Sequence, residues 1–185
     1  MYPNLVVKVL PRTEESIWAK ALLAVLGTAV LALSAKVQIP FWPVPMTMQT
    51  FVVLILGMAY GARLGAATLS LYLIEGAVGI PVFATGSGIA YIAGPTGGYL
   101  IGFLLAAYTI GWLANKGWDR SMIKTLGAML VGTAIIFLFG IAWLSTFIGF
   151  EKAVAAGLTP FILSEALKIA LAVIIMPLLW KRFSK

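Results

Sequence analysis

Leu126–Phe150 reads LGAMLVGTAIIFLFGIAWLSTFIGF, a run of 25 residues without a charged side chain. About 20 apolar residues are enough for a helix to cross the hydrocarbon core of a bilayer, so this run predicts a transmembrane helix. Because the run is longer than a straight crossing requires, we expect the helix to tilt. This stretch places the chain in a membrane.

The rest of the chain has the same character. Hydrophobic residues make up 62% of its 185 residues and charged residues only 10%, which is outside the usual range of soluble globular proteins. We expect an all-α integral membrane protein with one domain over residues 1–185 and a six-helix fold over 18–181. Reading apolar runs against charged or Pro/Gly-rich breaks places the spans near residues 18–35, 47–60, 63–81, 95–114, 121–149 and 159–180.

Basic residues predict the orientation. The segment Met1–Ser16 lacks the positive-then-apolar order of a secretory signal, and we expect it to be a cytoplasmic tail. With the N-terminus inside, only Lys36 and Lys152 face outward. Ten basic residues then lie on the cytoplasmic side: Lys8, Arg12, Lys20, Arg63, Lys116, Arg120, Lys124, Lys181, Arg182 and Lys185. Both termini are therefore expected on the cytoplasmic side of the plasma membrane.

Several classes of function are excluded by composition. The chain has no cysteine and no histidine, which removes disulfides, the usual zinc ligand sets and Ser-His or Cys-His catalysis. Its basic residues are scattered and form no stripe for nucleic acid. The glycine-rich segments at 86–88 and 94–99 lack the Gly-Lys-Ser/Thr ending of an ATP-binding loop. We expect no metal, no cofactor and no nucleic-acid partner; membrane lipid surrounds the chain.

Glu165 and Lys168 are the candidate binding residues. Charges inside a span are costly unless they are paired or face water, and these two are spaced i, i+3 on one helix face. Together they offer an acceptor beside a cluster of donors, which suits a neutral ligand group carrying both N–H and C=O. The alternative is a structural pair that joins helices, or a lysine that snorkels to the interface.

Other polar residues are weaker candidates for ligand contact. Glu75 lies near the outer end of the third span and either touches a ligand or reaches the interface. Gln49, Thr96 and Tyr99, like Thr47 and Thr50, lie at span starts, where helix capping and interhelical hydrogen bonds are the commoner roles.

The loop at residues 37–46 is a candidate lid or wall of a site. Its run Pro40-Phe41-Trp42-Pro43-Val44-Pro45 cannot be regular helix, because prolines remove donors and clash. Such backbone is tolerated at membrane depth only where protein covers it or it lines a cavity. Trp42 is accordingly a candidate ligand contact, and a rigid interfacial turn is the alternative.

Ala24, Thr28 and Ala32 recur every four residues along the first span. Small residues at this spacing let another helix approach closely. The approaching helix belongs either to a partner protein or to this chain.

Three motifs carry a family resemblance: Gln38-Ile-Pro-Phe-Trp-Pro-Val-Pro-Met-Thr-Met-Gln-Thr50, Gly79-Ile-Pro-Val-Phe83 and Gly94-Pro-Thr-Gly-Gly-Tyr99. In this order they resemble the BioY family, the biotin-specific membrane components of energy-coupling-factor (ECF) transporters. The resemblance covers roughly Ala21 to Lys181, and Glu165-x-x-Lys168 matches the family's acidic-x-x-Lys pattern. Glu165 is one methylene longer than the aspartate or asparagine common there.

The resemblance implies six membrane helices, with a pocket toward the outer face that is closed by the loop joining the first two. It implies that Glu165 and Lys168 hold the ureido ring of biotin. It also implies an ECF module of two cytoplasmic ATPases and one transmembrane coupling protein, which would meet Ala24, Thr28 and Ala32. The receptor for the biotin carboxylate is left open, with Ser87, Thr96, Tyr99 and loop N–H groups as candidates.

Three functions are therefore weighed. The first is a high-affinity biotin-binding component, and the second is the same architecture binding another vitamin or small heterocycle. The third is an intramembrane enzyme that uses Glu165 and Lys168 as acid and base. No nucleophile-base constellation accompanies the pair, so we expect the chain not to be an enzyme.

Overall fold

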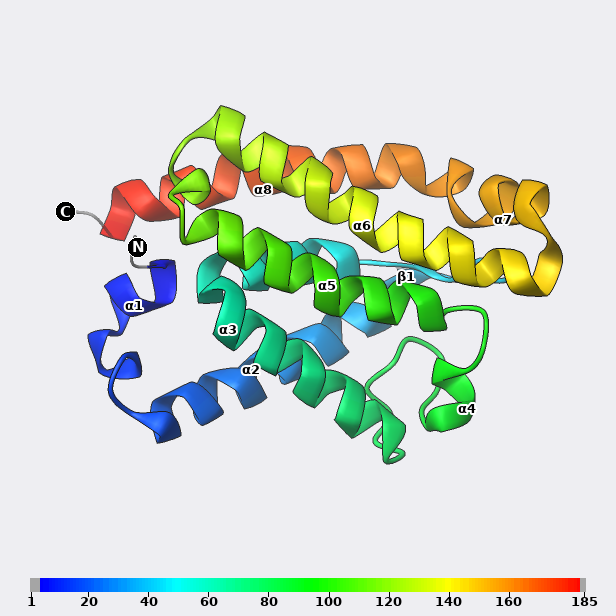
Figure 1. Ribbon diagram of the computed structural model, residues 1–185, viewed down its shortest axis with the longest axis horizontal. Coiled ribbons are helices and arrows are strands. Elements are labelled where there is room, and N and C mark those ends of the chain that lie inside the picture. Colours follow the sequence, from blue (N-terminus) through cyan, green and yellow to red (C-terminus); the bar gives the residue numbers. More distant parts are fainter. Residues whose placement is uncertain (1–3, 184–185) are drawn as a thin grey trace.

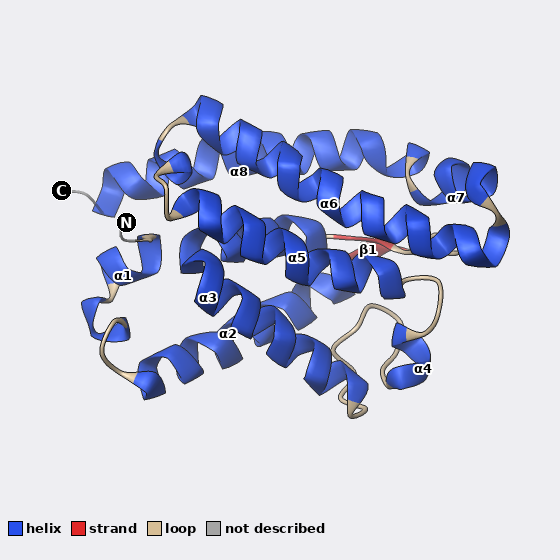
Figure 2. Ribbon diagram, in the orientation of Figure 1, coloured by secondary structure: helices blue, strands red, loops and turns tan. Residues whose placement is uncertain are grey.

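The computed structural model describes residues 4–183 and is built almost entirely of helices (Figures 1 and 2). Two short helical elements precede the first long helix, and a short antiparallel pair of strands joins it to the second. The elements in order are α1 Leu5–Val9, η1 Pro11–Thr13, α2 Ile17–Lys36, β1 Gln38–Ile39, β2 Met46–Thr47, α3 Gln49–Ala77, α4 Ile89–Ile92, α5 Gly97–Ala114, η2 Trp118–Arg120, α6 Met122–Ile148, α7 Phe150–Gly157, η3 Thr159–Phe161 and α8 Ile162–Phe183.

Five helical stretches of the described chain are long and apolar enough to cross a membrane: Ile17–Lys36, Gln49–Ala77, Gly97–Ala114, Met122–Ile148 and Phe150–Phe183. The all-α membrane class predicted from the sequence is therefore confirmed. The last stretch contains α7, η3 and α8, and the fully helical α8 corresponds to the sixth predicted span.

The stretch α3 contains the expected break between the second and third spans. Gly61 has φ 77° and ψ 175°, which is not helical. A Cβ built on Gly65 would lie 3.3 Å from the Cα of Gly57. Residues eight apart in a continuous helix are separated by about 12 Å along its axis, so the halves 49–60 and 62–77 fold back on each other. The sequence places this break between Tyr60 and Arg63, and the structure places it at Gly61; the number of membrane crossings stays a prediction.

The helix α5 lies at the centre of the molecule, packed on both halves of α3 and on α6 (Figure 1). Small residues allow the close approach. A Cβ on Gly57 would lie 2.8 Å from the Cα of Ala107, and one on Gly102 would lie 2.9 Å from the Cα of Ile136. Small residues at helix contacts are the usual means of close packing in membranes, where burial of apolar surface provides little driving force for helix association.

The predicted loop 37–46 forms, together with Thr47, a β-hairpin. Gln38 pairs with Thr47 and Ile39 with Met46, and the three prolines lie in the connection between the strands. Proline has no N–H to give to a strand ladder, which explains why the prolines lie outside the paired residues. The hairpin leads into α3, and in the view of Figure 2 it lies behind α5 and α6.

The N-terminal segment is folded. Asn4 caps α1 by accepting from Val7 N at 3.0 Å, and its side-chain amide donates to the Tyr60 carbonyl at 2.7 Å. Leu5 is buried against the bundle. The segment predicted only as a tail therefore forms a helical cover over the turn in α3.

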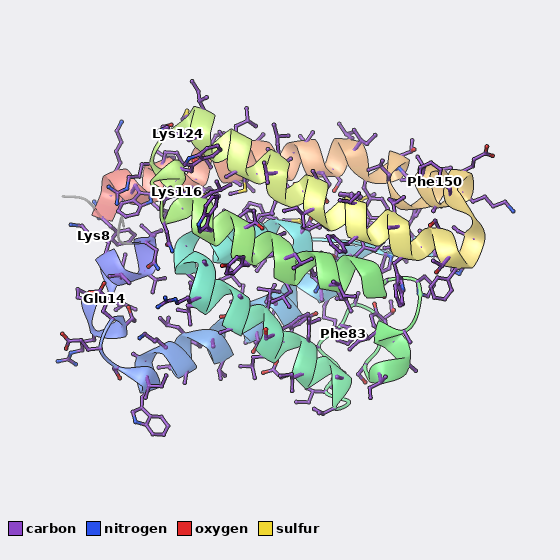
Figure 3. All side chains as sticks on the ribbon, viewed as in Figure 1. Lys8, Glu14, Phe83, Lys116, Lys124 and Phe150 are labelled. Carbon is purple, nitrogen blue, oxygen red and sulfur yellow. The ribbon has the colours of Figure 1, made fainter. Side chains whose placement is uncertain are left out.

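The molecule has a basic end. Both termini lie at one end of the bundle, with Lys8, Lys116 and Lys124, while Phe83 and Phe150 lie toward the other (Figure 3). The hairpin, α4 and α7 lie away from the basic end. This separation agrees with the charge asymmetry read from the sequence; which end faces the cytoplasm stays a prediction.

Candidate functional site

Glu165 and Lys168 form the ion pair that their spacing predicts. Lys168 Nζ lies 2.7 Å from Glu165 Oε1, and both residues are buried, with 7% and 4% of their surface exposed. Both lie on one face of α8, within its first two turns. Burial excludes the snorkelling alternative, because the ammonium group ends inside the protein.

Two threonines fasten the pair to other elements. Lys168 Nζ donates to the Thr47 carbonyl at 2.7 Å and to Thr50 Oγ1 at 3.0 Å. The Thr50 hydroxyl in turn donates to Glu165 Oε1 at 2.9 Å. All three ammonium protons have acceptors, so Lys168 joins α8 to the hairpin and to the start of α3.

Glu165 retains an unused acceptor. Its Oε2 is buried and has no hydrogen-bond partner among the described residues. A buried carboxylate oxygen without a partner costs free energy, unless a ligand supplies an N–H or O–H group. Glu165 also lines a cavity, so a molecule bound there would lie beside its side chain.

The cavity has a polar end and aromatic walls. About 500 Å³ of space lies between its lining atoms, and this space includes solvent outside the protein. Glu165, Gln49, Thr47 and Thr50 supply the polar end. Its remaining lining is mainly apolar or aromatic: Val44, Pro45, Phe83, Ala84, Tyr91, Thr96, Tyr99, Leu100, Phe103, Phe137 and Phe161.

The aromatic walls are held in fixed positions by contacts with one another. Phe137 meets Tyr99 and Phe161 edge to face, with both pairs of ring centroids 5.9 Å apart. Phe83 and Tyr91 are stacked at 5.0 Å. The Tyr99 hydroxyl donates to the Gly157 carbonyl at 2.8 Å, tying α5 to the end of α7. Such walls favour a flat or cyclic apolar body.

A second hollow lies on the other side of the hairpin. About 450 Å³ of space, open solvent included, lies between its lining residues, which are Val37, Gln38, Ile39, Met46, Thr47, Met48, Ser164 and Lys168. Thr47 lines both spaces, while Glu165 lines only the first and Lys168 only the second. The ion pair and Thr47 thus lie between the two.

The cavity gathers four of the eight predicted ligand residues: Glu165, Gln49, Thr96 and Tyr99. Lys168 adjoins it through the ion pair. Three others lie elsewhere. Trp42 is 82% exposed and outside the lining, because the hairpin connection directs it away. Glu75 faces α2, where its Oε1 accepts from the Thr28 hydroxyl at 3.0 Å, and Ser87 is outside the lining as well.

The predicted docking stripe is packed inside the chain. Ala24 and Thr28 are buried, and Ala32 is half-buried. Between them Gly27 lies so close to α3 that a Cβ there would be 2.6 Å from the Thr68 methyl group. The second alternative, an approaching helix of this chain, therefore explains the stripe. The opposite face of α2 is exposed and apolar, with Trp18, Leu22 and Leu33.

Sequence reasoning missed three contributors to the site. Thr47 and Thr50 were treated only as span-start residues, and Thr47 contributes through its backbone carbonyl, which no side-chain pattern reveals. Tyr72 was not singled out, and its hydroxyl bonds the side chain of Gln49. Apart from Tyr99, the aromatic wall residues were not singled out, because aromatics are frequent along every span.

Comparison with known proteins gives the family of this chain. The model of the BioY family matches residues 9–185. "Probable biotin transporter BioY" of Pyrococcus horikoshii is 42% identical over 154 residues, which cover 83% of this chain and 91% of that protein. "Biotin transporter BioY" of Thermotoga maritima is 37% identical over 150 residues, covering 80% and 88%.

A solved structure is also similar. The crystal structure of "the S-component for biotin from an ECF-type ABC transporter" matches with a TM-score of 0.77 and 25% sequence identity. The match covers 88% of this chain and 91% of that one. Sequence, fold and the spacing of the buried pair lead to one assignment: the chain belongs to the BioY family.

Proposed function

We propose that this chain is the biotin-binding component of a vitamin uptake transporter, which captures biotin outside the cell for import. The observation that carries the proposal is the free, buried oxygen of Glu165 at the polar end of an aromatic cavity. The relatives named as biotin transporters give this oxygen a ligand.

Biotin matches the two parts of the cavity. Its ureido ring carries two N–H donors and a C=O acceptor, and one N–H satisfies Glu165 Oε2. Its thiolane ring and valeryl chain are apolar and lie against the aromatic walls. Glu165 is thus the direct contact, while Lys168 fixes it in place and neutralises its charge.

The biotin carboxylate needs neutral donors in this chain. Thr96 and Tyr91 line the cavity and carry hydroxyl groups to which residues 4–183 supply no hydrogen-bond partner. Both are free to donate to a carboxylate. We propose that Thr96 and Tyr91, rather than Ser87, bind the biotin carboxylate. Ser87 lies outside the cavity lining.

Energy for import comes from a partner. The proposal includes an ECF module of two cytoplasmic ATPases and one transmembrane coupling protein, supported by the named likeness to an ECF-type S-component. Biotin is cargo here rather than cofactor, and we propose no catalytic step for Glu165 and Lys168.

Isothermal titration of the detergent-solubilised chain tests the proposal. We expect saturable binding of one biotin per chain, with riboflavin and thiamine failing to compete in excess. Displacement of biotin by either of these heterocycles would favour the alternative, a component for another vitamin. Absence of saturable biotin binding by the folded chain would refute the proposal.

A further inference from the structure

Gln49 belongs to a short relay of hydrogen bonds behind the cavity wall. Its side-chain Nε2 donates to the Tyr72 hydroxyl at 2.7 Å, and that hydroxyl donates to the Val82 carbonyl at 2.8 Å. Gln49 is 4% exposed and Tyr72 is fully buried, with its ring edge-on to Phe83 at 5.5 Å. The relay connects the two halves of α3 with the segment 82–84.

Counting protons fixes the orientation of the Gln49 amide. A tyrosine hydroxyl has one proton, and this one goes to the Val82 carbonyl. Toward Gln49 the hydroxyl can therefore only accept, so the amide must present its NH₂ group to Tyr72. The amide oxygen then lies on the other side, where the described chain offers it no donor.

The residue that carries this oxygen lies at the polar end of the cavity. Gln49 lines the cavity and precedes Thr50, whose hydroxyl binds Glu165. Neither Glu165 Oε2 nor Gln49 Oε1 has a hydrogen-bond donor among the described residues, so both can accept a hydrogen bond from a ligand. A cyclic urea carries two N–H groups, one on each side of its carbonyl.

We propose that Tyr72 is a positioning residue for specificity: it turns the Gln49 oxygen toward the cavity to receive the second N–H of the ureido ring. This inference rests on the proposed function. Two fixed acceptors select a ring with two N–H donors, because a ring with one donor leaves a buried acceptor unpaired.

The test compares biotin with two analogues, each methylated at one ureido nitrogen. Tyr72→Phe removes the hydroxyl and keeps the ring against Phe83. We expect it to raise the Kd for biotin about five- to tenfold, the effect of one lost hydrogen bond. For one of the two analogues, the ratio of its Kd to that of biotin should fall by a similar factor.

A second variant keeps the inference testable if Tyr72→Phe folds poorly. Gln49→Met has a similar length but no acceptor oxygen, and it should lower the same ratio. Combined with Tyr72→Phe it should bind biotin no more weakly than Gln49→Met alone, because Tyr72 acts through Gln49.

Lys36→Met is the matched control for movement of the segment 82–84. Lys36 Nζ donates to the Phe83 carbonyl at 2.6 Å without contacting Gln49. The control should retain the wild-type ratio for both analogues. An unchanged ratio in Tyr72→Phe or Gln49→Met, or an equal fall in the control, would overturn the inference alone. A wild-type chain that does not bind biotin would overturn both the inference and the proposed function.

Discussion

At the scale of single residues, a buried charge is stable only as part of a network. Desolvation of Glu165 and Lys168 costs several kcal/mol per ion, and their attraction offsets this cost only with good geometry and further hydrogen bonds. Thr50 and the Thr47 carbonyl supply those bonds. Binding and folding are therefore coupled at this pair.

Lys168→Met should destabilise the chain by about 3–5 kcal/mol, because it leaves the Glu165 carboxylate buried without a counter-charge. The double variant Glu165→Gln/Lys168→Met removes both charges and should recover much of this loss, yet bind biotin weakly. Thermal unfolding in detergent and calorimetric titration measure the two effects. A single variant as stable as the wild type would contradict the account.

Thr50→Val keeps the shape of the side chain but removes its hydroxyl, which bonds both charged groups. We expect a loss of about 1–3 kcal/mol in the free energy of unfolding and weaker biotin binding. Thr109→Val is the control, since the Thr109 hydroxyl bonds only the Leu105 carbonyl of its own helix. Equal effects of the two variants would show that the Thr50 bonds are not special.

The ion pair could be predicted from the sequence because charges in an apolar span stand out. Gln49 could be listed but not oriented, since its orientation depends on Tyr72, 23 residues away in the chain. Glu75 was a weaker candidate that could either touch a ligand or reach the interface, and the packing of α2 against α3 turns it toward Thr28. Residue type predicted which polar side chains are candidates for ligand contact. Tertiary contacts decide which of these side chains point toward the cavity.

At the scale of elements, the turn at Gly61 determines how α3 folds. Its backbone conformation is one that glycine adopts and other residues avoid. A Cβ there would also lie 2.7 Å from the side chains of Asn115 and Asn4. The fold-back of the two α3 halves depends on Gly61. The positions of Gln49 in the first half and Tyr72 in the second therefore depend on it as well.

Gly61→Ala should lower the free energy of unfolding by about 1–3 kcal/mol from backbone strain, with crowding added. Gly79→Ala is a suitable control, because Gly79 also has a positive φ, of 101°, but open space around its Cβ position. Melting temperatures in detergent should show the larger loss at Gly61. A smaller loss there than at Gly79 would argue against a close-packed turn.

The junction of α8 with η2 predicts a dependence on pH. Asp119 is fully buried between the spans, and burial raises its pKa above the usual value, although the Trp180 N–H at 2.6 Å acts to lower it. A raised pKa means that the folded state holds the proton more firmly than the unfolded state. This contribution to stability is present below the unfolded pKa and is lost as pH rises through the folded pKa.

Asp119→Asn keeps an acceptor for Trp180 and cannot ionise. The stability of the wild type relative to this variant should therefore fall as pH rises from about 4, the ordinary pKa of aspartate. Unfolding measured on both chains over a pH series gives the difference, in which the other carboxylates cancel. Parallel curves would mean that the Asp119 pKa is not raised.

The long apolar elements could be predicted because length and hydropathy define them. The hairpin, α4 and α7 could not, since such short elements depend on their tertiary surroundings. The third span was expected to reach Pro81, but α3 ends at Ala77. The irregular segment after it supplies Val82, Phe83 and Ala84 to the site.

At the scale of the whole molecule, charge and cavity lie at different ends. The basic residues gather near both termini, and the positive-inside rule predicts that this end is cytoplasmic (Figure 3). The hairpin and Phe83, which belong to the cavity, then face outward. A site on that side is where a chain that captures external biotin needs it.

Single cysteines test the orientation cleanly, because the chain has none of its own. We expect a membrane-impermeant maleimide to label Lys152→Cys on α7 in intact cells, and to label Lys124→Cys only after the cells are opened. The reverse pattern would invert the topology and place the cavity toward the cytoplasm.

The central claim is that the free oxygen of Glu165 binds the ureido ring, and a structure of this chain with biotin tests it most directly. The account predicts a ureido nitrogen at about 2.7–3.2 Å from Glu165 Oε2, the range of N–H···O bonds, with Lys168 still bonded to the Thr47 carbonyl. A ureido ring bound elsewhere, with Glu165 Oε2 still unpartnered, would contradict it.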